Sequence, residues 1–548
     1  MTNRFSVAAL GLLALAAAGC EDSLVVQNTN SPERERVFAL PTSVEQILGS
    51  GYQLCRNTEK NSNMFAQLAV MSGESYSALN NFNMGPRDAI PRAPIQNSPA
   101  ASQALYENFG GWSRQSRLLA LAMVRLDSVR KAESDGAALA TAALDTRARA
   151  VGFFNMGCTL GWLSLTYDSA GIVDHTDGNT ENVPPLSGYL EVNAAALAYL
   201  DSAIAEASKT ANGFPANALW FGGNAFSAAE FIRLARSFKA RFRANVPRNK
   251  ADAAAVNWAA VAADAEAGIT SDFLVQVGGS TGWSIGLSSS QFHVSAAWAQ
   301  LTMMYNGFAD TSGTYEAWLQ TPMLLRSPLN VNFTIRTPDT RWPQGATLDA
   351  QRAAASTGSG QPPSYTSLPY NRVRGEWSPG DPWGESWYSS FRYKYIRNNS
   401  NTGPYPDMLK AEMDLLAAEA YLRLGNMTQG LAKLNASRAR YNLPAVTGTD
   451  MNTQITGSGC VPRVPQPPNY TTVACGSVFE ALKYEMRMEL AYGNLGGWFF
   501  PNRRWEDLVQ GTPLFYPVPF EEMGARQRPF YNVGGGGYGT APQGTYRF

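Results

Sequence analysis

Four aromatic residues with the chemistry to bind a sugar crowd into twelve positions of this 548-residue chain: Trp377, Trp383, Trp387 and Tyr388. Prolines, glycines and an aspartate separate them, which is typical of a loop. Aromatic faces stack on the apolar faces of sugar rings, and nearby amides and carboxylates bind the hydroxyl groups. Further candidates lie in the same loop-rich region or in an earlier loop: Trp283, Trp318, Trp342 and Tyr76. We expect some of these eight to form a ligand platform; the alternative is that they pack the loops onto a scaffold.

Residues suited to catalysis or metal binding also occur, but their patterns favour structural roles. Glu485 and Glu489 lie one helical turn apart, where an acid–base pair could form, yet Lys483 and Arg487 lie beside them. This spacing predicts ion pairs on a solvated helix face. Acidic residues near His175 match no calcium loop and indicate a polar turn: Asp168, Asp174 and Asp177. No serine has a nucleophile elbow, so we expect neither an enzyme nor a metal or cofactor site.

The overall composition excludes several classes of protein. The 44 basic and 44 acidic side chains cancel, and no run of Lys and Arg appears, so nucleic-acid binding is not expected. The chain is 45% hydrophobic and 16% charged, which is enough apolar material for a large core. No linker rich in glycine, serine or charge divides the sequence after residue 40. We therefore expect a single domain of repeated units over residues 41–548.

The N-terminus has the features of an exported lipoprotein. The apolar run from Val7 to Ala18 follows a basic residue and is too short to span a bilayer as a helix. Small residues then lead to Cys20, as in a lipobox, where the thiol is acylated before cleavage. We expect residues 1–19 to be a signal peptide and residues 20–40 a lipidated tether that holds the protein to a membrane outside the cytoplasm. The alternative is an ordinary signal peptide with a cysteine by chance.

Four cysteines follow Cys20, and an even number outside the cytoplasm favours disulfides. Cys460 and Cys475 flank a proline-rich segment, so a bridge between them would close a surface loop. Cys55 and Cys158 would then form a long-range pair, although three connectivities are open. In the alternative, all four are free buried thiols.

Apolar residues recur every three and four positions through much of the chain, which predicts a mainly α-helical fold. Helices are expected at Thr42–Tyr52, Ser62–Met71, Glu107–Val129, Ala138–Tyr167, Gly188–Ala207, Ser227–Ala244, Ala251–Gly268, Tyr405–Leu424, Thr428–Tyr441 and Val478–Gly493. Residues 271–401 are rich in glycine, proline, serine and aromatic residues, which predicts a long irregular excursion. Short strands are expected in it near Val331–Ile335 and Phe391–Ile396.

The segment from Ala418 to Pro444 has the spacing of a tetratricopeptide repeat, in which small residues let two antiparallel helices approach closely. Its key positions are Ala418, Tyr421, Gly425, Leu434 and Ser437. Gly430 departs from the pattern, because alanine is preferred there. A weaker echo occurs at Ala196, Leu200 and Ala203. Helix pairs of this kind bury their faces by stacking; the alternative is unrelated helices that share a similar face.

With these features the chain resembles the SusD/RagB family of nutrient-binding lipoproteins. Four stretches carry the resemblance: Cys20 and the acidic residues after it, through Thr29-Asn30-Ser31-Pro32; Arg147–Tyr167 and the turn that follows; Asp407–Arg440; and Glu485–Tyr492 with Trp505-Glu506-Asp507-Leu508 and Tyr516-Pro517-Val518-Pro519. The resemblance covers nearly the whole mature chain.

The resemblance implies a scaffold of about four tetratricopeptide-like helix pairs with large loop excursions. It also implies a lipid-anchored protein of the outer membrane that binds a nutrient glycan without catalysis. The implied partner is a SusC-like, TonB-dependent barrel that receives the glycan. Two other functions stay open from the sequence: a scaffold whose grooves bind a peptide or protein, and a surface hydrolase.

Overall fold

The computed structural model describes residues 37–536, apart from gaps at 39, 61–62, 77–82, 90, 100–102, 133–138, 140–141, 180, 210–213, 215–216, 286–299, 323–324, 326–333, 356–363 and 374–386. Cys20, the predicted signal peptide and most of the predicted tether lie outside the described residues.

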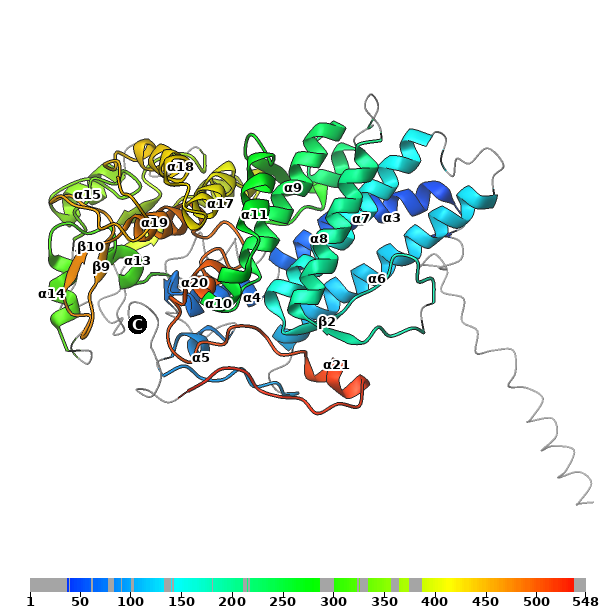
Figure 1. Ribbon diagram of the computed structural model, residues 1–548, viewed down its shortest axis with the longest axis horizontal. Helices are drawn as coiled ribbons and strands as arrows, with labels where there is room; N and C mark the ends of the chain where they lie inside the picture. The colour runs from blue at the N-terminus through cyan, green and yellow to red at the C-terminus, as the bar shows by residue number, and fades with distance from the viewer. Residues whose placement is uncertain are drawn as a thin grey trace, which may run out of the picture.

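Helices form most of the described chain and stand side by side in a row (Figure 1). The longer ones are α3 (Pro41–Lys60), α6 (Gln103–Ala132), α7 (Ala142–Thr166), α8 (Tyr189–Ala207), α9 (Ala228–Asn245), α17 (Lys410–Arg423), α18 (Met427–Arg440) and α19 (Val478–Leu490). The predicted mainly α-helical fold is confirmed, although α3 continues past Tyr52 to Lys60.

Two predicted helices are wrong in part. The segment predicted at Ala251–Gly268 divides into α10 (Lys250–Ala255) and α11 (Trp258–Glu266), because Asn257 caps a new start by accepting from the Ala260 amide. The helix predicted from Tyr405 begins only at Lys410 and is preceded by a strand, β8 (Gly403–Met408). Prolines 404 and 406 explain this, because the residue before a proline avoids helical geometry.

Shorter elements complete the fold. The other helices outside the excursion are α4 (Asn63–Met71), α5 (Met84–Asp88), α20 (Phe499–Trp505), α21 (Phe520–Ala525) and the 3₁₀ turn η1 (Ala218–Phe221). The strands pair antiparallel: β1 (Ser75–Tyr76) with β5 (Gln300–Leu301), β2 (Ser169–Gly171) with β3 (Leu186–Gly188), β4 (Phe273–Val277) with β8, β6 (Asn371–Val373) with β7 (Tyr388–Ser390), and β9 (Arg463–Pro465) with β10 (Val473–Cys475). In β4–β8, Val275 lies opposite Tyr405.

Glycines on α7 let its neighbours in the row approach closely. A side chain on Gly157 would lie 2.7 Å from Leu200 of α8, and one on Gly161 would overlap the Phe242 ring of α9. Along the row, α7 packs against α6 and α8, α9 against α8 and α11, and α17 against α11, α18 and α19. This arrangement buries one continuous core.

The α17–α18 pair has the predicted repeat geometry. Gly425 ends α17 in the left-handed conformation (φ 75°), and Asn426 caps α18. Ala418, Leu434 and Ser437 are buried between the helices. Gly430, which departs from the repeat pattern, is explained by packing: an added methyl group would lie 2.6 Å from Leu422. The predicted echo on α8 is also buried: Ala196, Leu200 and Ala203.

The excursion connects α11 to α17 and contains more helix than predicted: α13 (Met303–Gly307), α14 (Thr314–Gln320), α15 (Leu348–Ala355), α16 (Lys394–Asn398) and the turn η2 (Gly279–Thr281). The strand predicted at Phe391–Ile396 is wrong, because β7 ends at Ser390 and α16 follows. In the strand predicted at Val331–Ile335, residues 331–333 lie outside the description, and the Ile335 amide donates to the Tyr388 hydroxyl instead of to a strand.

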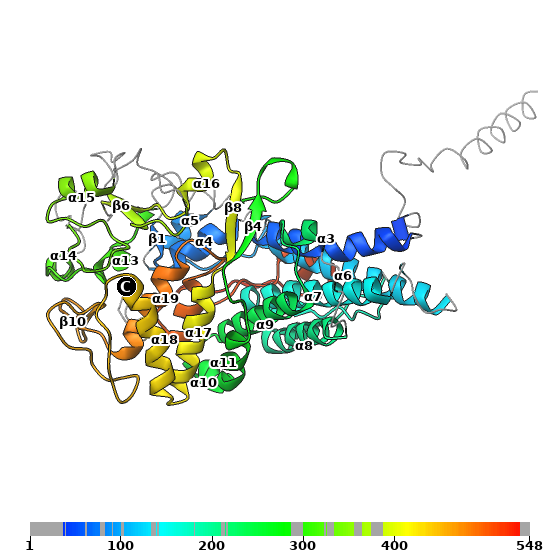
Figure 2. The ribbon, with the colours of Figure 1, turned by 90° about the horizontal axis from the view of Figure 1, so that it is seen from above.

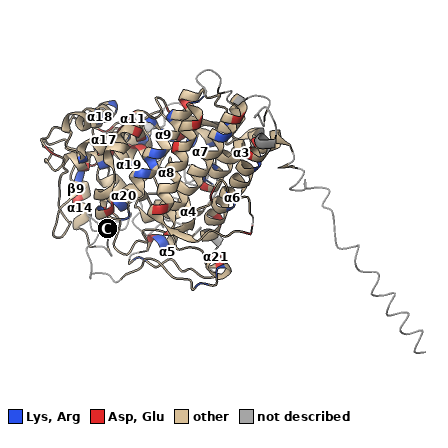
Figure 3. Cartoon of the chain, turned by 45° about the vertical axis from the view of Figure 1, so that its right-hand side comes forward, with Lys and Arg blue, Asp and Glu red and all other residues tan. Residues whose placement is uncertain are grey.

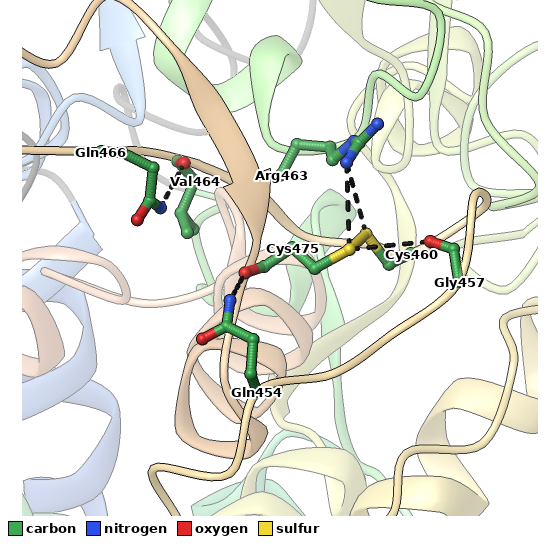
Figure 4. The surroundings of a disulfide bond; sticks show 7 residues. All are labelled: Gln454, Gly457, Cys460, Arg463, Val464, Gln466 and Cys475. Atoms are coloured by element: carbon green, nitrogen blue, oxygen red, sulfur yellow. Dashed lines mark hydrogen bonds between the residues drawn. A yellow bond between two sulfur atoms is a disulfide. The ribbon is translucent and has the colours of Figure 1, made fainter.

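The structure joins Cys460 to Cys475 and leaves Cys55 and Cys158 free and buried. The predicted surface-loop bridge is therefore present (Figure 4), whereas the predicted long-range pair is absent. Burial raises the pKa of both free thiols well above the usual range, so they act as small apolar side chains in the core.

The surface of the helix row carries both signs of charge. Figure 3 shows Lys and Arg interspersed with Asp and Glu along the helices that face the viewer. Within the described residues, no helix is both long enough and apolar enough to cross a membrane.

Candidate ligand-binding face

The eight predicted platform residues fall into three groups. Trp377 and Trp383 lie outside the described residues, and Trp387 and Tyr76 are half-buried. The other four are buried, with at most 8% of the residue exposed: Trp283, Trp318, Trp342 and Tyr388. A stacked ligand needs an exposed ring face, so the structure corrects the prediction for these four.

The buried rings pack the excursion onto the scaffold. Trp342 lies edge-on to Tyr305 and to Tyr388, with ring centroids 5.6 and 5.5 Å apart. Trp283 packs 5.9 Å from Tyr52, which belongs to α3. Such pairs contribute about 0.5–1.5 kcal/mol beyond the burial of their area. The packing alternative considered for these aromatic residues therefore holds for this subset.

Trp387 lies where the tryptophan-rich segment meets the described chain. It directly precedes β7, in which Tyr388 pairs with Val373 at the end of β6. Trp387 is the member of the predicted cluster of four that stays partly accessible among the described residues.

A pair of tyrosines that sequence reasoning missed provides an aromatic surface. Tyr365 and Tyr395 are both half-buried, and their ring centroids lie 6.3 Å apart with the ring planes tilted by 43°. The Tyr365 hydroxyl donates to Asp272 (2.9 Å), and the Tyr395 hydroxyl donates to the Pro404 carbonyl (2.6 Å). Burial raises the pKa of both phenols, so both stay protonated donors. The hydroxyl contacts fix the two rings in place.

Exposed polar residues adjoin the pair. They follow Tyr395 at the end of α16 and are all exposed: Arg397, Asn398, Asn399, Ser400 and Asn401. Ser400 and Asn401 adopt left-handed conformations, with φ of 54° and 60°. We call Tyr365, Tyr395 and residues 397–401 the tyrosine face. In Figure 2, α16 and the adjacent β8 lie on the side of the molecule opposite α18. Rings beside amide groups suit a ligand that has both apolar faces and hydroxyl groups.

Arg392 ties the tyrosine face to the scaffold. Its Nε donates to the Tyr365 carbonyl (3.1 Å), and its Nη1 donates to the Glu489 carbonyl at the end of α19 (2.8 Å). The guanidinium lies 4.1 Å from the Tyr370 ring centroid. Arg392 is buried, so these contacts form a fixed link between the excursion and the helix row.

The charged residues of α19 contradict a second prediction, that of a solvated helix face. Glu485, Glu489, Lys483 and Arg487 are all buried, not solvated. Lys483 and Arg487 share the carboxylate of Asp507, with Lys483 Nζ 3.0 Å from it. The i,i+4 pattern of charges predicts a solvated face, but α17, α18 and the excursion enclose this helix.

Glu485 is held as a hydrogen-bond acceptor. Arg341 donates to its two oxygens at 2.9 and 3.1 Å, and Ser437 donates at 2.8 Å. Burial alone would lower the pKa of Arg341, but Asp339 and Glu485 raise it well above the usual value. These contacts give the acid a structural role.

The acidic turn near His175 is the predicted polar turn. Asp174 accepts from the Thr176 amide (2.8 Å), and Asp177 accepts from Arg117 (3.0 Å). The Thr176 bond lowers the pKa of Asp174, and the Arg117 bond lowers that of Asp177. Among the described residues, no three His, Cys, Asp or Glu side chains gather as metal ligands would.

No family model and no curated protein matches this sequence, whereas solved structures match most of it. A SusD superfamily protein from Bacteroides vulgatus gives a TM-score of 0.54 at 14% identity, covering 88% of this chain and 97% of its own. The chain has the SusD-like fold. A SusD superfamily protein from Bacteroides thetaiotaomicron gives 0.51 at 14% identity over 93% and 99%. A SusD homolog from Parabacteroides distasonis gives 0.50 at 13% identity over 86% and 85%.

In this SusD-like fold the helix row forms four packed pairs: α3–α6, α7–α8, α9–α11 and α17–α18. The excursion leaves the row after α11, at the end of the third pair, and returns before α17, at the start of the fourth. The tyrosine face therefore belongs to the connection between two neighbouring helix pairs.

Proposed function

We propose that this protein binds a glycan at the cell surface and delivers it to a SusC-like, TonB-dependent outer-membrane transporter, without catalysis. The SusD-like fold, which covers 88% of the chain and 97% of a SusD superfamily neighbour, is the observation that carries the proposal. Local motifs of the sequence that resemble the SusD/RagB family also support it, among them Asp407–Arg440.

A sugar is the ligand class that the candidate face fits best. The tyrosine face combines two fixed, half-buried rings with exposed amide groups. Trp387 adds a partly accessible ring beside β7. Trp377, Trp383 and Tyr76 stay in the proposal as further ligand contacts. Several weak stacking contacts of this kind add up to useful affinity for a polymer with repeated units.

We also propose that acyl chains on Cys20 anchor the protein and that residues 20–40 act as its tether. A tether raises the effective concentration of the binding domain at the partner barrel. Cys20→Ala should release the protein from outer-membrane fractions into the medium while leaving purified-protein melting curves unchanged. Retention of the variant in the membrane would contradict the anchor.

The ligand test is isothermal titration against a panel of neutral and acidic oligosaccharides and a second panel of peptides. We expect saturable binding of at least one glycan, weakened about tenfold or more by Tyr365→Ala with Tyr395→Ala, since two stacking contacts are lost. Tyr470→Ala, a half-buried tyrosine in the disulfide loop, is the matched control.

Each other outcome points to a different function. Saturable peptide binding without glycan binding would favour the scaffold alternative. Release of sugar products from a polysaccharide would favour a hydrolase. Glycan binding that survives the double substitution would remove the tyrosine face from the site but not glycan binding itself.

A further inference from the structure

The Cys460–Cys475 disulfide lies against a guanidinium group. Arg463 Nη1 is 3.6 Å from Cys460 Sγ and 3.8 Å from Cys475 Sγ. Figure 4 shows the Arg463 side chain pointing toward both sulfur atoms. The strand pair β9–β10 sets this geometry, because Arg463 lies directly opposite Cys475 in the ladder.

The two sulfur atoms differ in their surroundings. Cys460 is buried, with 5% of the residue exposed, whereas Cys475 is partly exposed. The Gly457 carbonyl oxygen lies 3.6 Å from Cys475 Sγ, where it disfavours negative charge on that sulfur. An incoming thiol therefore has better access to Cys475. The cation lies near both sulfur atoms, but the Gly457 oxygen opposes its effect at Cys475, so negative charge is favoured on Cys460.

Thiol–disulfide exchange depends on these two properties. The attacking thiolate needs an accessible sulfur, and the reaction is faster when the departing thiolate is stabilised. A nearby cation is a common means of stabilising a protein thiolate. Cys475 provides the accessible sulfur, and Cys460 provides the thiolate that is stabilised as it departs.

We propose that Cys475 is a site of exchange with low-molecular-weight thiols, with Cys460 as the leaving thiolate and Arg463 as the group that stabilises it. In this step an external thiolate attacks Cys475 Sγ, a new sulfur–sulfur bond forms there, and the Cys460–Cys475 bond breaks. The electron pair of that bond stays on Cys460 Sγ. A second external thiol can release the first from Cys475 as a symmetric disulfide, which completes a two-electron reduction of the protein.

The bonds around the bridge keep the loop in place after exchange. The Arg463 amide donates to the Phe308 carbonyl (2.9 Å), and the Val473 amide donates to Glu316 of α14 (3.1 Å). The modification should therefore be reversible without unfolding of the domain.

The experiment incubates the full chain with glutathione, quenches with an alkylating agent, and maps the products by peptide mass spectrometry over time. We expect glutathione on Cys475 and the alkyl group on Cys460. Arg463→Met, which keeps the side-chain bulk without the charge, should slow the exchange about three- to tenfold, and Arg463→Lys should change it by less than about twofold.

Arg352→Ala, which removes an exposed arginine of α15, is the control and should leave the rate unchanged. Glutathione on Cys460 in place of Cys475 would overturn the proposal. An Arg463→Met rate that is equal to or faster than that of the control would overturn it too, provided the melting curves agree. Labelling of Cys55 or Cys158 is distinguished by peptide position.

Discussion

Arginines are buried in two regions of this protein with different kinds of partner. Around α17 and α19, each guanidinium meets a carboxylate: Arg341 meets Glu485 at 2.9 Å, and Arg504 meets Glu419, with Nε 3.1 Å from Oε1. At the ends of α7 and α9, Arg503 donates only to main-chain carbonyls. These belong to Leu165 (2.9 Å), Asn245 (2.8 Å), Pro247 (3.0 Å) and Leu514 (2.7 Å).

In the second region, main-chain carbonyls at helix ends take the place of carboxylates as partners of the arginine. The last carbonyls of a helix lack partners within the helix and carry partial negative charge, so they can hold a cation. Burial, and next the neighbouring Arg248, lower the pKa of Arg503, whereas the acids near Arg341 raise that of Arg341. A carboxylate holds the charge more firmly, but it can be neutralised by acid, and a main-chain carbonyl cannot.

The largest loss of stability should come from substituting an arginine that is bound to carboxylates. Arg341→Met leaves Asp339 and Glu485 buried without their cation. We expect the free energy of unfolding to fall by about 3–5 kcal/mol, measured by urea denaturation. A loss below about 1 kcal/mol would mean that the acids find other partners, and the comparison would fail.

Lowering the pH should reduce the stability that comes from the region around α17 and α19, where arginines contact carboxylates, and not that from the region of Arg503. Burial would raise the pKa of Glu419, but Arg504 and Arg423 hold it at about 2 in the folded protein. Because this pKa is depressed, its stabilisation of about 3 kcal/mol is present above the unfolded pKa of about 4.3 and is lost as the pH falls toward 2. Urea titrations at a series of pH values should show a shallower acid loss for Glu419→Gln. An unchanged slope would reassign the acid sensitivity to other groups.

Removal of the carbonyl-bound arginine should have a smaller effect. Arg503→Met leaves three carbonyls without a donor, while Leu514 still accepts from Arg248. The substitution strands no charge, and it relieves repulsion with Arg248. We expect a loss of about 2 kcal/mol that is independent of pH between 2 and 5, by the same urea titrations. A loss larger than that of Arg341→Met would reverse the order of the two regions.

An exposed ion pair should matter least. Arg352 and Asp349 of α15 lie 2.9 Å apart, and both side chains are about half exposed or more. Arg352→Ala should change the midpoint of thermal unfolding very little, corresponding to about 0.5 kcal/mol or less, and added salt should remove the difference. A larger change would show that α15 stabilises the excursion through this pair.

Local patterns in the sequence predict most of the longer helices, because apolar spacing and capping residues act over a few residues; the short helices of the excursion are missed. Asn426, for example, both follows the glycine that ends α17 and caps α18. Burial could not be predicted in the same way. Nothing near Glu485 or Trp342 in the sequence reveals that segments far along the chain enclose them.

The tyrosine face shows the same limit at the candidate site. Tyr365 and Tyr395 are separated by 30 positions and come together only because both pack near β4 and β8 through Asp272 and Pro404. Aromatic density in the sequence instead favoured Tyr388, and the loop-rich composition favoured Trp283 and Trp342; the fold uses all three for packing. Local density indicates aromatic content but not which rings stay accessible.

The packing of α11 against α17, across the excursion, has a consequence for the folding pathway. The two helices are separated by residues 267–409, whereas α8 and α9 are separated by residues 208–227. The entropy of closing the longer connection is greater by about 2 kcal/mol. We expect the N-terminal helices to assemble first and the apolar face of α11 to stay uncovered until α17 has been synthesised. During that interval we expect the uncovered apolar face to make the nascent chain most prone to aggregation.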